Sequence, residues 1–141
     1  MSRFKMGASS FDAFSGLGKH VNRFQSECIP NQGPIPRGEY YIFDRQIGGR
    51  FAWLWDIVHS HKKDWFALYP ADEKIDDERL CDEIKRGAFR LHPKGDFGIS
   101  EGCITVESWT DYQRVKSLFK CTKKEKMPGS DLDCYGSVRV W

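Results

Sequence analysis

Short runs of β-branched and aromatic residues, separated by glycine and proline, recur along the 141-residue chain. The densest run, GEYYIFDRQIGGRFAWLWDIVHSH, covers residues 38–61, and its Gly48-Gly49 pair indicates a hairpin between two strands. Further strands are predicted by the runs DWFALYP, AFRLHP, ITV and YGSVRVW, at residues 64–70, 88–93, 104–106 and 135–141. Strand and helix units do not alternate and no repeat is present, so the sequence predicts a mainly β or α+β fold.

Two segments carry a helical pattern. In residues 71–87, Ile75, Leu80 and Ile84 recur among carboxylates, and Gly87 is a candidate residue just past a helix C-terminus. In residues 107–120, Ser108 and Asp111 form a capping-box-type start. The apolar stripe of this second segment comprises Tyr112, Val115, Leu118 and Phe119. We therefore expect two short helices beside the strands.

The length of the chain fits one domain spanning residues 1–141. Residues 1–34 are rich in glycine, serine, asparagine and proline, and we expect short strands joined by loops there. The remaining residues, 35–141, are expected to form the core that carries the candidate chemistry.

Charge and hydropathy exclude some classes of protein. The net charge is +2, from 22 basic and 20 acidic side chains, which cannot supply the broad basic face of a nucleic-acid-binding protein. Only residues 120–126 are locally basic, and we expect a solvated loop there. No stretch has the length of a secretory h-region or a transmembrane segment. We expect synthesis in the cytoplasm without a signal peptide, and no membrane insertion.

The five cysteines contain no CxxC pair, so the spacing typical of a zinc ribbon or a thioredoxin motif is missing. In an oxidising compartment four could pair and one would be left over. Cys121 and Cys134 flank a glycine-containing loop and are the first pair to test. His59 and His61 would share one face of a strand, but no carboxylate or cysteine supports them at a suitable spacing. No metal or other cofactor is expected.

The stretch LHPKGDFGISEGCITV, residues 91–106, combines a histidine, a serine and a cysteine. Strand alternation puts Arg90 and His92 on the face opposite Phe89 and Leu91. The ten residues between His92 and Cys103 could bring imidazole and thiol together in a hairpin-like geometry. A cysteine thiolate with a base nearby is a nucleophile.

Two neighbours of Cys103 suit this chemistry. Gly102 lacks a Cβ, which permits a tight turn and the approach of a substrate carbonyl to backbone N–H groups. Ser100 could hydrogen-bond the imidazole or a substrate carboxylate. The residues alone leave the alternative open that Cys103 is a buried structural thiol and His92 a surface imidazole.

The segment FRLHPKGDFGISEGCITV resembles the His…Ser-x-Gly-Cys signature of L,D-transpeptidases, and GPIPRGEYYI, residues 33–42, resembles the strand that precedes it in that fold. The short chain, the start FDAFSG and the spacer before the histidine are most similar to the type VI secretion L,D-transpeptidase effectors, toxins injected into a rival's periplasm. The resemblance implies an L,D-transpeptidase-like β-sandwich.

The resemblance also implies residue roles. Cys103 would be the nucleophile, His92 its base and later acid, Ser100 part of the motif that orients them, and the backbone at Gly102 and Cys103 the oxyanion site. Glu101 stands where the general L,D-transpeptidase pattern has a second histidine, and Thr105 where it commonly has arginine or asparagine. We take Glu101 and Arg90 as candidate substrate-binding residues.

The implied activity is a cysteine-dependent L,D-carboxypeptidase or L,D-transpeptidase acting on peptidoglycan tetrapeptide stems between meso-diaminopimelate and D-alanine. The implied partners are the peptide stems, a cognate immunity protein and the type VI apparatus, and the implied place of action is the periplasm of target bacteria. Two alternatives stay open: a papain-like murein endopeptidase or amidase, against which the His-before-Cys order argues, and a non-catalytic module that binds murein or a partner.

Overall fold

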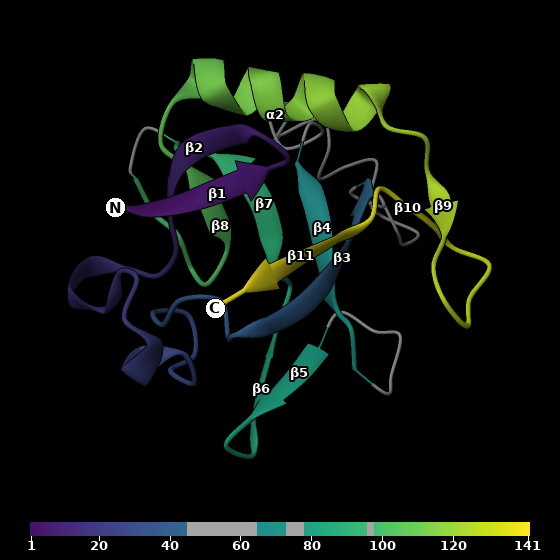
Figure 1. Ribbon diagram of the computed structural model, residues 1–141. Coiled ribbons are helices and arrows are strands. Elements are labelled where there is room, and N and C mark those ends of the chain that lie inside the picture. Colours follow the sequence, from purple (N-terminus) through teal and green to yellow (C-terminus); the bar gives the residue numbers. More distant parts are fainter. Residues whose placement is uncertain (45–64, 73–77, 96–97) are drawn as a thin grey trace, which may run out of the picture.

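A computed structural model describes residues 1–44, 65–72, 78–95 and 98–141 (Figure 1). Strands β1 to β4 are Ser2–Met6, Ser9–Phe14, Gly38–Asp44 and Phe66–Pro70, and strands β5 to β8 are Glu78–Cys81, Ile84–Gly87, Arg90–Pro93 and Ile104–Val106. Helix α2 is Trp109–Cys121, and β9, β10 and β11 are Glu125–Lys126, Asp133–Cys134 and Ser137–Val140. Short 3-10 helices cover Gly18–His20 and Phe24–Ser26.

Seven strands form one sheet in the order β1-β2-β8-β7-β4-β3-β11. All neighbours in this sheet are antiparallel except β7 and β8, which are parallel. The mainly β fold is confirmed: this seven-stranded sheet curls around its core, and β5–β6 and β9–β10 form two further two-stranded sheets (Figure 1). Strands β1 and β2 belong to this sheet, so the first part of residues 1–34 is built into the fold.

The core lies between the sheet and α2, which packs against β7 and β8. Phe119 of α2 contacts Phe4 of β1 and Phe66 of β4, with ring centroids 6.5 and 4.8 Å apart. A second, smaller cluster on the other face of β3 and β4 contains Phe43, Ala67, Met127 and Cys134. The central strands are therefore buried on both faces, which explains their continuous apolar sequences.

Helix α2 begins as the sequence predicts. The Ser108 hydroxyl accepts a hydrogen bond from the backbone N–H of Asp111, which satisfies one of the N–H groups left unpaired at a helix start. Tyr112, Val115 and Phe119 of the predicted stripe are buried, whereas Leu118 is partly exposed. Within the described residues, no helix is long and apolar enough to cross a membrane.

The helix predicted in residues 71–87 is wrong for the part of that segment that the structure describes. Residues 78–87 form the β5–β6 hairpin, with Cys81 opposite Ile84. Its two turn residues, Asp82 and Glu83, both have positive φ, at 47° and 66°, as a two-residue hairpin turn of type I′ requires. Leu80 and Ile84, two of the residues that suggested the helix, are exposed, so the pattern does not mark a buried face. The predicted Gly48-Gly49 hairpin lies outside the described residues.

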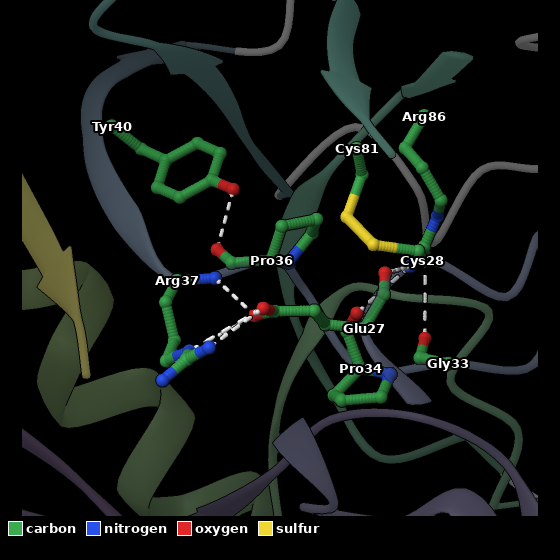
Figure 2. The surroundings of a disulfide bond; sticks show 9 residues. All are labelled: Glu27, Cys28, Gly33, Pro34, Pro36, Arg37, Tyr40, Cys81 and Arg86. Carbon is green, nitrogen blue, oxygen red and sulfur yellow. Dashed lines mark hydrogen bonds and ion pairs between the residues drawn. A yellow bond between two sulfur atoms is a disulfide. The ribbon is translucent and has the colours of Figure 1, made fainter. Parts of the chain in front are cut away.

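A disulfide joins Cys28, in the loop before β3, to Cys81 in the hairpin, with Cα atoms 5.2 Å apart (Figure 2). The suggested Cys121–Cys134 pair is wrong, because Cys121 is exposed at the end of α2 whereas Cys134 is buried in the smaller cluster. The loop is also closed by Glu27, which accepts hydrogen bonds from the backbone and side chain of Arg37. Burial raises the pKa of Glu27, but these bonds outweigh it and leave the pKa below its ordinary value.

The basic run at residues 120–126 is more than a solvated loop. Lys120 and Lys124 both form ion pairs with Asp44 at the end of β3, and the Tyr135 hydroxyl donates to the same carboxylate at 2.9 Å. Burial would raise the pKa of Asp44, but the hydrogen bonds from Lys124, Lys120 and Tyr135 lower it to about 2. This cluster ties the end of α2 to the sheet.

Removing the disulfide should destabilise the protein. The bond links residues 53 apart in sequence, and cross-linking a loop of that length restricts the unfolded chain strongly. We expect the Cys28→Ser/Cys81→Ser double variant to lose about 2–4 kcal/mol of unfolding free energy in urea titrations. The Cys121→Ser variant is the control, and equal losses in both would contradict this pairing.

Replacing Asp44 should lower the free energy of unfolding by an amount that depends on pH. A carboxyl whose pKa is lower in the folded state stabilises that state above its unfolded pKa, and the contribution disappears as pH falls. Because the side chain is partly exposed, we expect Asp44→Asn to cost about 1 kcal/mol at neutral pH, after allowance for solvent screening. Urea titrations should show this difference shrinking between about pH 4 and pH 2. Asp12→Asn, at an exposed pair with Arg3, is the control; a pH-independent difference at Asp44 would contradict the assignment.

Candidate active site

His92 and Cys103 are placed by the parallel β7–β8 pair. In its register Leu91 lies opposite Ile104 and His92 opposite Thr105. Cys103 directly precedes β8 and lies two residues before Thr105, the register partner of His92. The hairpin-like geometry expected from the sequence is therefore wrong, because residues 94–103 return the chain to the start of a parallel neighbour.

The imidazole of His92 is buried, with an exposed fraction of 5%, so it is not the surface histidine of the alternative interpretation. Its ring stacks on Trp65 at a centroid distance of 4.3 Å. Nδ1 lies 2.8 Å from the carbonyl oxygen of Pro93, which can only accept, so Nδ1 carries the proton. Nε2 is then the basic nitrogen, and it lies 3.4 Å from the Thr105 hydroxyl.

Cys103 lies in a turn that its neighbours hold in place. Ser100 is fully buried, and its hydroxyl donates to the carbonyl oxygen of Cys103 at 2.8 Å. This contact differs from the two that the sequence suggested for Ser100, the imidazole and a substrate carboxylate, and it fixes the backbone of Cys103 instead. The Cys103 side chain is partly exposed and lies outside the disulfide. A nucleophilic cysteine requires partial exposure and a base or cation nearby, and Cys103 meets the first of these conditions.

Glycine at position 102 is required for two reasons. Its φ is +93°, in the left-handed region that other residues adopt at a cost. A Cβ at this position would also lie 2.3 Å from Nη2 of Arg86. The turn before Cys103 is thus packed directly against a guanidinium.

Arg86 is a site residue that the sequence did not reveal. It comes from β6, is almost fully buried, and donates hydrogen bonds to the carbonyl oxygens of Gly33 and Pro34 and to that of Glu27 (Figure 2). Burial lowers the pKa of Arg86, and negative charge at Tyr40, Cys103 and Glu27 acts in the opposite direction. The sequence around Arg86 does not predict these contacts, because they form only when the β5–β6 hairpin packs against the loop at residues 27–34.

The two candidate substrate-binding residues differ in their surroundings. Glu101 is exposed beside Gly102, and Arg90 is half-buried in β7, where its guanidinium donates to the carbonyl oxygen of Phe89 at 2.7 Å. Their role toward a substrate stays a prediction.

His59 and His61, considered as a metal pair, lie outside the described residues. In the part of the chain that the structure describes, no group of three or more histidine, cysteine and acidic side chains could hold a metal ion.

The model of the Tlde1 domain family matches residues 9–130, most of the chain. The chain belongs to this family. Its members are type VI secretion effectors of the L,D-transpeptidase kind, which confirms the family suggested by the His…Ser-x-Gly-Cys signature. No curated protein sequence matches the chain. The matched residues run from β2 to the β9–β10 loop of this Tlde1 domain and include every residue of the candidate site.

Gly102→Ala should lower the unfolding free energy of the Tlde1 domain by more than the cost of placing alanine in the left-handed conformation. The left-handed conformation alone costs alanine about 1–2 kcal/mol, and the methyl group must in addition displace the Arg86 guanidinium from its carbonyl partners. Gly129→Ala is the matched control, because its φ is +74° and a Cβ there meets nothing within 4 Å. Urea titrations should show the larger loss at position 102, and equal losses would contradict the contact with Arg86.

Proposed function

We propose that this protein is a cysteine-dependent L,D-carboxypeptidase and L,D-transpeptidase acting on the tetrapeptide stems of peptidoglycan. The observation that carries the proposal is the parallel β7–β8 register, in which the buried His92 lies opposite Thr105, two residues after Cys103. Membership of the Tlde1 family supports an enzyme acting on peptidoglycan.

In the first step Nε2 of His92 takes the proton of the Cys103 thiol, and the thiolate attacks the carbonyl carbon between meso-diaminopimelate and D-alanine. The bond from Nδ1 to the Pro93 carbonyl holds the imidazole in the tautomer that this step needs. Backbone N–H groups around Gly102 and Cys103 would stabilise the oxyanion of the tetrahedral intermediate.

Collapse of the intermediate breaks the amide bond. The protonated His92 gives its proton to the leaving amine of D-alanine, and an acyl thioester remains on Cys103. Water as the acceptor releases a tripeptide stem, a free D-amino acid gives exchange, and the amine of another stem gives a cross-link. Either of the first two removes a donor stem that cross-linking needs.

The proposal extends to the place of action. We propose that the protein is made in the cytoplasm, delivered by a type VI apparatus and active in the periplasm of target bacteria, with a cognate immunity protein that blocks the site. The Cys28–Cys81 disulfide supports work in an oxidising compartment, where such bonds persist.

The papain-like alternative gains no support. Papain-like enzymes place the nucleophile at a helix N-terminus, whereas Cys103 leads directly into β8 and α2 begins only at Trp109.

Purified muropeptides test the proposal. Wild-type protein should convert tetrapeptide stems to tripeptides and release D-alanine. Cys103→Ala should abolish this conversion, and His92→Ala should lower kcat by about 10²–10⁴, the usual contribution of general acid–base catalysis. The control is Cys121→Ala, which removes an exposed cysteine at the end of α2 and should leave the rate unchanged. Equal stem profiles from wild type and Cys103→Ala, or cleavage at a different bond, would refute the proposal.

A further inference from the structure

The guanidinium of Arg86 occupies an unusual place for a charged group. It is 5% exposed and donates to three carbonyl oxygens of one loop, with distances of 3.0 Å to Pro34 and 3.2 Å to Gly33 and a short bond to Glu27. These partners lie 52 to 59 residues away in the sequence. Carbonyl groups satisfy the N–H donors but do not neutralise the charge.

The one carboxylate of this loop, that of Glu27, is engaged with Arg37. The Glu27 carboxylate accepts hydrogen bonds from the backbone and side chain of Arg37, on the side away from its own carbonyl group (Figure 2). The disulfide from Cys28, the next residue, fixes the same loop to the hairpin that carries Arg86. The cation is therefore held at one position by the loop, the hairpin and the disulfide together.

The Nη2 end of the guanidinium, which binds the Gly33 carbonyl group, also faces the turn at Gly102 and Cys103. Nη2 is the atom that a Cβ at Gly102 would meet at 2.3 Å, and the carbonyl oxygen of Gly33 lies 3.4 Å from the same point. Cys103, the next residue, is near enough that its negative charge acts on the ionisation of Arg86. The turn thus rests on a platform made of the guanidinium and the loop carbonyl groups.

We propose that Arg86 is the positioning residue of the nucleophile: it supports the Gly102–Cys103 turn from beneath, and its charge favours the thiolate of Cys103. The inference rests on the proposed function, in which Cys103 attacks the substrate. Three of its five N–H donors bind carbonyl groups and the residue is 5% exposed, so we assign Arg86 no contact with the substrate itself.

Substitutions at position 86 can separate support of the Gly102–Cys103 turn from the effect of the charge on the Cys103 thiolate. The planar fork of arginine reaches several carbonyl groups at once, whereas lysine offers its charge from a single point. Arg86→Lys therefore keeps the charge and loses most of the support. Arg86→Gln loses the charge and keeps some hydrogen-bonding capacity.

The test measures the rate of iodoacetamide alkylation of Cys103 between pH 5 and pH 10 in oxidised protein, with the modified peptide identified by mass spectrometry. All variants carry Cys121→Ala, which removes the exposed thiol. We expect Arg86→Gln to raise the alkylation midpoint by about one pH unit, which lowers the thiolate fraction at neutral pH about tenfold. Arg114→Gln, at an exposed position of α2, is the matched control and should keep the wild-type midpoint.

A folded Arg86→Gln variant with the wild-type midpoint overturns the inference. Near-UV circular dichroism and the mass of the intact disulfide report whether each variant is folded. If Arg86→Gln does not fold, Arg86→Lys decides: the inference requires a wild-type midpoint together with a kcat on muropeptides at least about tenfold lower. A wild-type kcat, or a raised midpoint, in that variant also overturns it.

The two failures are distinguishable. The proposed function fails when wild type and Cys103→Ala give the same stem profile, a result in which Arg86 plays no part. The Arg86 inference fails in the alkylation profile, which needs no muropeptide, or in the kcat of Arg86→Lys, which is compared only with a wild type that converts the stems.

Discussion

The parallel pairing of β7 with β8 is the constraint on which the site depends. Parallel neighbours usually need a connection of a dozen residues or more, and here the chain returns within residues 94–103. Such a short return demands a tight turn before β8, which the buried Ser100 hydroxyl and the left-handed Gly102 provide. The same register sets His92 across from Thr105, two residues after Cys103, so one pairing brings together the two strand ends that carry the candidate site.

Features encoded by nearby residues were predictable. The strands at residues 66–70, 90–93 and 104–106 follow from β-branched and aromatic runs bounded by proline and glycine, and the start of α2 follows from the spacing of Ser108 and Asp111. Each of these signals acts within a few residues, where propensity and capping decide the structure. The family, too, was readable from one short signature around Cys103.

Features that depend on distant contacts were missed. Residues 78–87 carry a helical apolar spacing, yet the buried contacts of Arg86 with the loop at residues 27–34 and the bond from Cys81 to Cys28 hold them as a hairpin. Tertiary contacts of this kind override local propensity, as they commonly do. The parallel direction of β7 and β8 was missed for the same reason, because a ten-residue connection suggests a hairpin.

The Cys28–Cys81 bond also makes the structure of a sample depend on whether the sample has been reduced or oxidised. A chain kept in a reducing compartment retains both thiols, and nothing covalent then ties the loop of Glu27 to the hairpin of Arg86. In a reduced preparation the loop can separate from the hairpin during local unfolding, whereas in an oxidised preparation the disulfide keeps the two together beneath Gly102. Measurements of stability or activity on this protein are therefore comparable only between samples in which this cysteine pair has the same oxidation state.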